Sequence, residues 1–255
     1  MSETTDGRSR QLRIADSIRA RIEAGEYQPG DQLPGLPALA QQYQASLVTV
    51  RLAITRLKNE GLIVSRQGVG NFIRRKPTVK RYGIGRYSRS VWGGQNPKPL
   101  LIAEGGQQGK TIGQTTETEQ VPAPSFVAER LPGISEGDLV YVRRRTTTID
   151  GVINQSADSY FTLATGQRSP DIVAGEGPGG HIARINAISP VLEVQEEITA
   201  RMPTSPESAR LEIPDGTPVF EVIRTYHTAD GPLDVAKFVI RADMAAFDYR
   251  FPTPD

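Results

Sequence analysis

The pattern of hydrophobic and polar residues divides the chain into two parts with different periodicities. Up to about residue 60, apolar residues recur at spacings of three and four, which indicates amphipathic helices. From about residue 100 onward, stretches rich in β-branched and aromatic residues alternate with turn residues, which is typical of antiparallel strands. We therefore expect a helical N-terminal part followed by a β-rich C-terminal part.

Three helices are expected in the first part, and two of them carry a long apolar stripe. The stripe residues are Leu12, Ile14, Ala15, Ile18 and Ile22 in the first helix and Val50, Ala53, Ile54 and Leu57 in the third. The short second helix lies in LPALAQQYQAS, where Pro37 is tolerated in the first turn. Gly25 suits the end of the first helix, and Ser46 is a good N-cap for the third.

A two-stranded hairpin is expected directly after the third helix. The stretch LIVSRQGVGNFIRR has Gly68 and Gly70 in its turn. Three helices followed by such a hairpin, or wing, are the element order of a winged helix-turn-helix domain. The major groove of DNA admits an α-helix, and a basic hairpin can reach the adjacent backbone or minor groove. We therefore expect a DNA-binding domain over residues 1–75.

Nine residues of the third helix and the wing are candidates for contact with double-stranded DNA. They are Ser46, Leu47, Thr49, Arg51, Arg56, Arg66, Gln67, Gly68 and Gly70. Simpler roles stay open for some of them. Arg51 could be a solvated helix residue, Arg56 could pair with Glu60 one turn away, and the glycines could serve only the turn.

The charge distribution agrees with a polyanion partner at one end of the chain. Residues 1–90 contain 16 Lys and Arg and 7 Asp and Glu, which gives 16 − 7 = +9. Residues 91–255 contain 14 and 22, which gives 14 − 22 = −8. A basic N-terminal third on an acidic remainder favours nucleic-acid binding by the first part alone.

The remainder of the chain predicts an α+β domain around an antiparallel sheet over residues 96–255. DLVYVRRRTTTIDGVINQSADSYF and TPVFEVIRTYHTADGPLDVAKFVIRAD each read as a hairpin with a glycine-containing turn. SFVAERLPG and HIARINAISP predict short helices, and VLEVQEEITARMP fits either a strand or a helix. Between the two domains, residues 76–95 are basic and lack apolar periodicity over most of their length, so they are expected to be a linker.

With both parts considered together, the chain resembles the GntR family of bacterial transcription regulators, and within it the HutC-like subfamily. The matching N-terminal motifs are Leu33-Pro34, Leu39-Ala40, Thr49-Val50-Arg51, Glu60-Gly61-Leu62 and Gly68-Val69-Gly70. The C-terminal matches are VRRRTTTIDG, ADSYF, EEITARMPT and the second hairpin. The resemblance implies an effector-binding UTRA domain that shares the fold of chorismate lyase.

Three positions depart from the pattern of that family. Gly35-Leu36-Pro37 replaces a polar segment, and Leu47 replaces a common polar or basic residue at the start of the recognition helix. Leu47 could instead contact a thymine methyl group. Thr147 stands where a second arginine is frequent, which leaves the identity of the effector open.

Eight residues are candidates for contact with a small anionic effector. They are Arg145, Thr147, Asp158, Tyr160, Glu197, Arg224, Tyr226 and Arg241. By resemblance, Arg145 matches a position that holds an anionic group, and arginine suits bidentate recognition of carboxylate or phosphate. On a strand, Arg143 and Arg145 share one face and Arg144 the other. A structural ion pair stays open for Arg145, and a core or ion-pair role for the others.

Other functional classes find little support in the residues. The chain has no cysteine, and His181 and His227 lack a neighbouring metal-ligand pattern, so we expect no metal site. GEGPGG lacks the context of a phosphate-binding loop, and we expect no cofactor. The polar N-terminus and the lack of a long apolar run predict a cytoplasmic protein without a signal peptide or membrane span.

The sequence therefore predicts a homodimeric transcription regulator, a repressor in preference to an activator. Each winged helix would bind one half of a near-palindromic operator, and a small anionic metabolite would modulate that binding. Two alternatives stay open. One is a constitutive dimeric repressor without an effector. The other is a lyase-type enzyme, against which no catalytic set of acid, base and nucleophile is evident.

Overall fold

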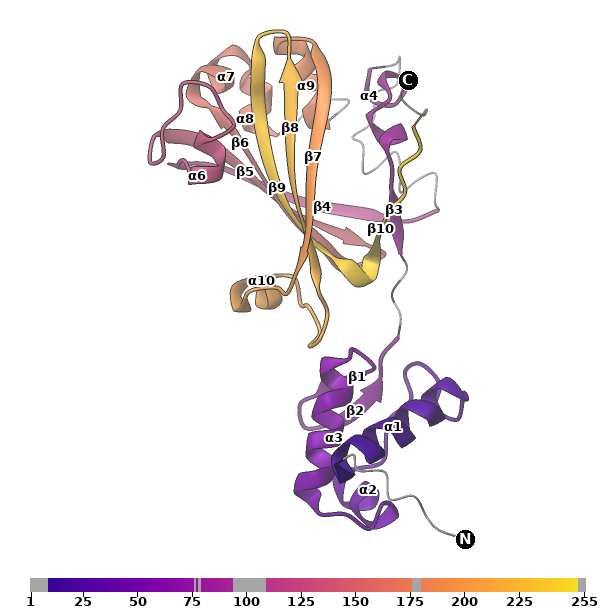
Figure 1. Ribbon diagram of the computed structural model, residues 1–255. Helices are drawn as coiled ribbons and strands as arrows, with labels where there is room; N and C mark the ends of the chain where they lie inside the picture. Colours follow the sequence, from indigo (N-terminus) through magenta and orange to yellow (C-terminus); the bar gives the residue numbers. More distant parts are fainter. Residues whose placement is uncertain (1–8, 76, 78, 94–108, 176–179, 252–255) are drawn as a thin grey trace. The chain divides into compact units, whose positions relative to one another are not determined.

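The computed structural model describes residues 9–75, 77, 79–93, 109–175 and 180–251. Two compact units are present, one formed by Met1–Thr78 with Ile213–Thr217 and the other by Val79–Glu212 with Pro218–Asp255. The N-terminal unit is mainly helical, and the C-terminal unit is built on a large antiparallel sheet (Figure 1). The α+β fold class expected from the sequence is confirmed.

The N-terminal unit has the three helices and the hairpin that the sequence predicts. Its elements are α1 Arg10–Glu23, α2 Leu36–Gln42, α3 Leu47–Asn59, β1 Ile63–Arg66 and β2 Gly70–Ile73. The predicted apolar stripes of α1 and α3 meet in one core, which Leu33, Leu39, Ile63 and Ile73 complete. The buried members of this core are apolar, so packing is the main constraint on the orientation of α3.

Local signals set the ends of these helices. The Ser46 side chain caps α3 by accepting a hydrogen bond from the Thr49 backbone N–H at 3.1 Å. Pro37 lies in the first turn of α2, where its missing N–H costs nothing. Gly25 and Gly61 follow α1 and α3 with positive φ angles of 78° and 69°, which end a helix without Cβ strain.

The C-terminal unit is built on one six-stranded antiparallel sheet in the order β4-β5-β6-β9-β8-β7. The strands are β4 Ile112–Pro122, β5 Leu139–Ile149, β6 Val152–Thr162, β7 Val191–Arg201, β8 Val219–Thr228 and β9 Gly231–Arg241. Both predicted hairpins are present as β5–β6 and β8–β9. The ambiguous stretch at Val191 is strand β7, which pairs with β8 along nearly its whole length.

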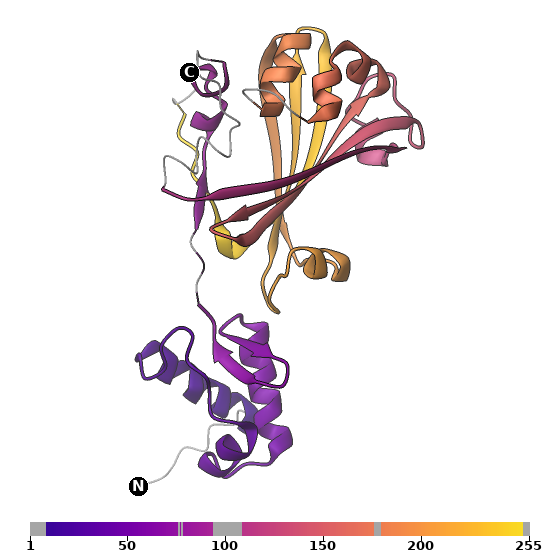
Figure 2. The same cartoon turned by 180° about the vertical axis from the view of Figure 1, so that it is seen from behind.

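Short helices accompany the sheet, and they are α6 Ser125–Ala128, α7 Leu163–Arg168, α8 Pro170–Ala174, α9 Gly180–Ile188 and α10 Ser205–Arg210. Helices α7, α8 and α9 gather at one end of the sheet (Figures 1 and 2). Strand alternation separates two apolar clusters on opposite faces. Phe161 and Tyr226 pack with Ile182 of α9 on one face, while Val142 and Tyr160 pack with Val127 of α6 on the other.

Part of the expected linker belongs to the C-terminal unit. Residues 80–92 form β3 Lys80–Tyr82, the 3-10 helix η1 Ile84–Tyr87 and α4 Arg89–Trp92. Strand β3 pairs in parallel with β10 Ala245–Phe247, and Tyr82 stacks on Phe247 with ring centroids 5.4 Å apart. The expected linker of residues 76–95 is therefore too long, because residues 80–92 form secondary structure in the C-terminal unit. The local sequence could not indicate this, since the partner strand β10 lies more than 150 residues further along the chain. Residues 76, 78, 94 and 95 lie outside the described residues.

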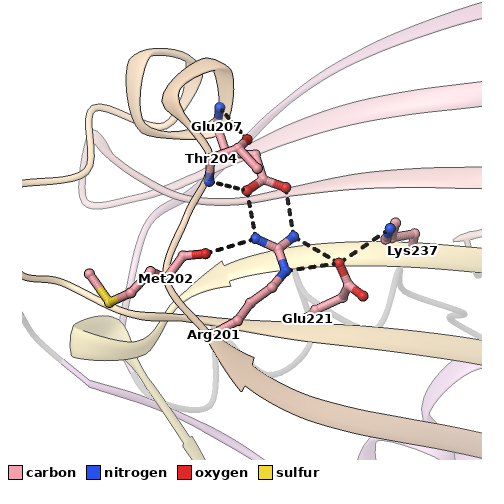
Figure 3. A network of polar contacts seen from close by, with 6 residues as sticks. All are labelled: Arg201, Met202, Thr204, Glu207, Glu221 and Lys237. Atoms are coloured by element: carbon pink, nitrogen blue, oxygen red, sulfur yellow. Dashed lines mark hydrogen bonds and ion pairs between the residues drawn. The ribbon is translucent and has the colours of Figure 1, made fainter.

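An ion-pair network joins the end of β7 to α10 (Figure 3). The Arg201 guanidinium donates to both carboxylate oxygens of Glu207, each at 2.7 Å, and to Glu221 Oε2 at 2.7 Å. Glu207 also closes a capping box with Thr204 at the start of α10. The hydrogen bonds from Arg201 lower the pKa of Glu207 to about 2. The network therefore fixes a corner that a short helix could not hold by itself.

Candidate DNA-binding surface and ligand cavity

The outer face of α3 carries the side chains expected at DNA. Arg51 is exposed and Thr49 is half-buried, while Val50, Ala53, Ile54 and Leu57 of the same helix are buried. The Ser46 and Thr49 hydroxyl groups lie 2.8 Å apart and hydrogen bond to each other. Ser46 thus has a structural role as the cap of α3, and Arg51 projects from the first turns of a helix that the core holds in place.

Arg56 makes the intrahelical contact that the sequence left open. Its Nε lies 2.9 Å from Glu60 Oε1, and Glu60 also accepts a hydrogen bond from Arg19 Nη2 at 2.7 Å. The Arg56 side chain keeps 53% of its surface exposed, so this pair is a solvated one and is worth little to stability. Arg51 and Arg56 are therefore not equivalent cations, because only Arg56 is already held by a carboxylate.

The wing presents an open tip. Gly68 has a φ of 72°, and a Cβ at this position would meet no atom within 4 Å. Gly70 has a φ of 141°, and a Cβ there would lie 2.7 Å from Gln32 Nε2, which donates to Val69 O at 2.8 Å. Arg66 lies over the Phe72 ring at 4.7 Å, and Gln67 is exposed. Gly70 thus serves the packing of the wing, while Gly68 leaves its tip accessible.

A cavity of about 90 Å³ lies in the C-terminal unit, over the sheet face that α9 covers. Five arginines line it, namely Arg86, Arg143, Arg145, Arg184 and Arg224. The other described lining residues with polar or large side chains are Gln114, Thr116, His181, Ile182, Tyr226 and Phe238. No aspartate or glutamate is among the described lining residues, so the cavity wall is strongly cationic.

Arg143 and Arg145 carry the clearest unmet hydrogen-bonding capacity in this wall. Arg143 is 2% exposed, yet its Nε and Nη2 atoms have no hydrogen-bond partner, and neither has Arg145 Nε. Burial and the neighbouring Arg145 hold the pKa of Arg143 well below its usual value. Burial and the nearby Arg224 lower the pKa of Arg145 to about 10. Buried cations without partners cost free energy, which a bound anion would recover.

Behind this wall, His181 and Arg224 share one buried carboxylate. His181 Nε2 lies 2.6 Å from Asp234 Oδ2, and Arg224 Nη2 lies 3.3 Å from Asp234 Oδ1. Burial and the nearby Arg143 lower the pKa of His181 to about 3, so the imidazole is neutral at pH 7. A neutral ring that donates from Nε2 has an acceptor at Nδ1, and this atom is buried without a partner. The wall thus combines free donors with one free acceptor.

Three of the eight expected effector residues line this cavity, namely Arg145, Arg224 and Tyr226. Strand alternation explains most of the difference, since Asp158, Tyr160 and Glu197 lie on the opposite face of the sheet. Asp158 pairs with Arg144 at 3.3 Å, and Glu197 pairs with Arg130 at 3.0 Å.

The remaining expected residues also have other contacts. Tyr160 packs edge-on against Phe126 at 5.5 Å. Arg241 Nη2 pairs with Asp243 Oδ2 at 2.9 Å. Thr147 is buried beside the cavity, where Gln114 Nε2 donates to its hydroxyl at 3.4 Å. The expectation that these five residues face the cavity is therefore not met.

Sequence reasoning missed several residues of the cavity. Arg143 could have been identified from the sequence, because strand alternation places it on the same face as Arg145. His181 and Arg184 could have been grouped, because they stand three apart on one helix. Arg86 of the cavity wall and Asp234 behind it gave no comparable signal, because their positions depend on contacts between distant elements. The expected GEGPGG segment lies largely outside the described residues, apart from Gly175 and Gly180, which line the cavity.

In the described ranges, no group of three or more His, Cys, Asp or Glu side chains could hold a metal ion. None of the helices in the described part of the chain is long and apolar enough to cross a membrane.

Comparisons with known families match both units. The family described as bacterial regulatory proteins, gntR family, matches residues 10–73, and the UTRA domain matches residues 106–246. An HTH-type transcriptional regulator of Streptomyces coelicolor, itself uncharacterized, is 33% identical over 95% of this chain and 92% of its own length. The HTH-type transcriptional repressor NagR of Bacillus subtilis is 25% identical over 92% of this chain and 91% of its own.

Solved structures give the same assignment. A crystal structure described as a GntR-family transcriptional regulator has a TM-score of 0.65 and 27% identity, and the match covers 97% of this chain and 99% of that one. PhnF from Mycobacterium smegmatis has a TM-score of 0.55 at 20% identity, with coverage of 94% and 100%, which supports the fold.

Proposed function

Because the chain belongs to the GntR family of bacterial regulatory proteins and pairs its DNA-binding domain with a UTRA effector domain, we propose that it is a repressor whose operator binding responds to a small anionic metabolite in the arginine-lined cavity. It is a transcription regulator and not an enzyme. The observation that carries the proposal is the pair Arg143 and Arg145, in which Arg143 Nε and Nη2 and Arg145 Nε are buried without a hydrogen-bond partner.

The cavity fits a carboxylate or phosphate group better than a neutral or cationic one. Guanidinium groups bind such anions through paired, charge-assisted hydrogen bonds. The neutral His181 adds an acceptor, which suits a hydroxyl or amine beside the anionic group. A cavity of about 90 Å³ has room for a small anionic group.

A homodimer on a near-palindromic operator is part of the proposal. A two-fold dimer presents two identical heads, and these match two inverted half-sites. The repressor role rests on a relative that carries that description, the transcriptional repressor NagR. A regulator of this kind acts in the cytoplasm, where it meets the chromosome.

Effector control needs a difference in affinity between two states. A ligand can release the operator only if it binds the arrangement with low DNA affinity more tightly than the other. For a tenfold change in operator affinity the required difference is about 1.4 kcal/mol, which one well-placed anion contact can supply.

The test is a thermal-shift screen of the full-length protein with inorganic phosphate, phosphorylated sugars and small carboxylates. Ligand binding stabilises the folded state, so an effector raises Tm in a saturable way. Arg143→Met should abolish that shift. Arg144→Met is the matched control, because Arg144 lies on the opposite face of the same strand and pairs with Asp158.

Two outcomes contradict effector control in this form. One is an equal shift in the Arg143 and Arg144 variants, which would place the ligand elsewhere. The other is the lack of any shift with the whole panel while operator binding stays intact. The second result would favour a constitutive repressor, an alternative that the buried Thr147 supports, since it does not line the cavity where relatives often have a second arginine.

A further inference from the structure

The outer face of α3 is more apolar than a DNA-contacting helix requires. Leu47, Val48 and Leu52 have exposed fractions of 48%, 64% and 49%. Single exposed apolar residues are common on protein surfaces and need no explanation. Here three of them fall within the first two turns of one helix, and none packs into the core of the N-terminal unit.

Helical spacing places these residues around Arg51. Val48 and Leu52 are four apart, and so are Leu47 and Arg51, so two short rows run side by side on the helix surface. Polar capacity is limited in the same region. The Thr49 hydroxyl already bonds to Ser46, and the Ser46 hydroxyl caps the helix. Hydrogen bonding alone therefore gives this part of α3 little means of distinguishing bases.

Charge complementarity decides which partner fits this face. Residues 1–78 of the N-terminal unit contain 12 Lys and Arg and 7 Asp and Glu, which gives 12 − 7 = +5, and Arg51 is exposed on the same helix as the apolar residues. An exposed cation within a small apolar patch, on a basic domain, suits a polyanion with apolar groups, and not a second hydrophobic protein surface. In the major groove, the C5-methyl group of thymine is the apolar feature that a side chain can contact.

We propose that Leu47, Val48 and Leu52 read the C5-methyl groups of thymines in the operator, while Arg51 contacts a neighbouring base or phosphate. The inference rests on operator binding by the N-terminal domain. It predicts half-sites in which thymines occupy fixed positions because of their methyl groups, and not because of their hydrogen-bonding edges.

The experiment starts from the operator that the wild-type protein enriches from a random DNA pool. Duplexes are then made in which each thymine is replaced singly by deoxyuridine, which removes only the methyl group. Loss of one buried methyl contact should weaken binding about fourfold at the contacted positions and leave the others unchanged. In the double variant Leu47→Ala, Val48→Ala, deoxyuridine should have no effect at the positions these residues read.

Controls separate this inference from the proposal on which it rests. Val152→Ala removes an exposed apolar residue of the C-terminal unit, and its response to deoxyuridine should equal that of wild type. Circular dichroism and a Tm within a few degrees of wild type show that the double variant folds.

Three results overturn the inference. Equal affinity for every deoxyuridine duplex, with discrimination against a scrambled duplex retained, would refute methyl readout but leave operator binding standing. A second result combines two measurements: equal affinity for every deoxyuridine duplex, and weaker dimerisation of the double variant than of wild type. This result would assign the face to contact with a second copy of this chain. No enrichment of any sequence would refute operator binding and the inference together.

Discussion

The two units place their functional side chains in opposite environments. In the N-terminal unit an entirely apolar core supports α3, and the residues expected at DNA lie outside it in water. In the C-terminal unit Arg143, Arg224 and Asp234 lie inside, each with an exposed fraction of 3% or less. The first arrangement costs little to fold, while the second removes charges from water before any ligand compensates them.

This difference separates two kinds of binding. An exposed cation on a rigid helix attracts a polyanion over a long range, but salt screens that attraction. A buried cation acts only on what enters its cavity, and it acts strongly because water is excluded. The DNA-binding domain and the UTRA domain thus carry their arginines in two physically distinct environments, which suit the two proposed ligands.

The largest expected effect is at the buried carboxylate. Asp234→Asn removes the negative charge that His181 and Arg224 share, and it leaves the cations of the cavity uncompensated. We expect a loss of about 3 kcal/mol in the free energy of unfolding, measured by urea titration. Asp230→Asn is the control, since its exposed pair with Arg168 should contribute little. Equal losses in the two variants would contradict the comparison drawn between buried and exposed charge.

The exposed side of the comparison is tested at the two arginines of α3. Arg51→Ala should weaken specific operator binding by roughly tenfold to a hundredfold, because it removes a free cation that can contact a base. Arg56→Ala should have a smaller effect, since that side chain already pairs with Glu60. Fluorescence anisotropy at fixed salt measures both. A larger loss of operator affinity in the Arg56 variant than in the Arg51 variant would contradict the assignment of Arg51 as the more important DNA contact.

The smallest effect concerns the Arg201 network. The pKa of Glu207 is lowered from its usual 4.5 to about 2, so its contribution to stability is complete above about pH 5 and is lost as the pH falls toward 2. Glu207→Gln should cost about 1 kcal/mol at pH 7, after allowance for solvent screening of a partly exposed pair. Urea titrations from pH 7 downward should show the two proteins converging below pH 5. A constant difference across this range would mean that the ionised carboxylate is not what stabilises the corner.

The sequence predicts the N-terminal unit better than the cavity, because an apolar core leaves a periodic pattern in the sequence and a cluster of buried charges does not. The stripe Val50, Ala53, Ile54 and Leu57 has a helical period because the core behind α3 is apolar, so periodicity located it. Glycine-containing turns at Asp150-Gly151 and Asp230-Gly231 located both hairpins for an equally local reason.

The cavity was harder to predict because its members come from six distant elements. Residues on β5 such as Arg143 and Arg145 could be placed by alternation, but alternation cannot say which face α9 covers. Asp158 and Tyr160 were among the effector candidates for this reason, and the structure places them on the face opposite the cavity. Arg86 was missed because its segment read as a linker, and only the pairing of β3 with β10 brings it to the cavity.

The pairing of β3 with β10 also limits how far the DNA-binding domain can travel. Ile73 ends β2 and Lys80 begins β3, so only 80 − 73 = 7 peptide steps join the two. Even a fully stretched chain of that length reaches no more than about 25 Å. In the proposed dimer there are two such connections. The ends of the two β2 strands can therefore lie at most roughly 50 Å farther apart than the two β3 strands. If the proposed dimer binds two half-sites, a half-site separation beyond this reach would require that strand pair to open.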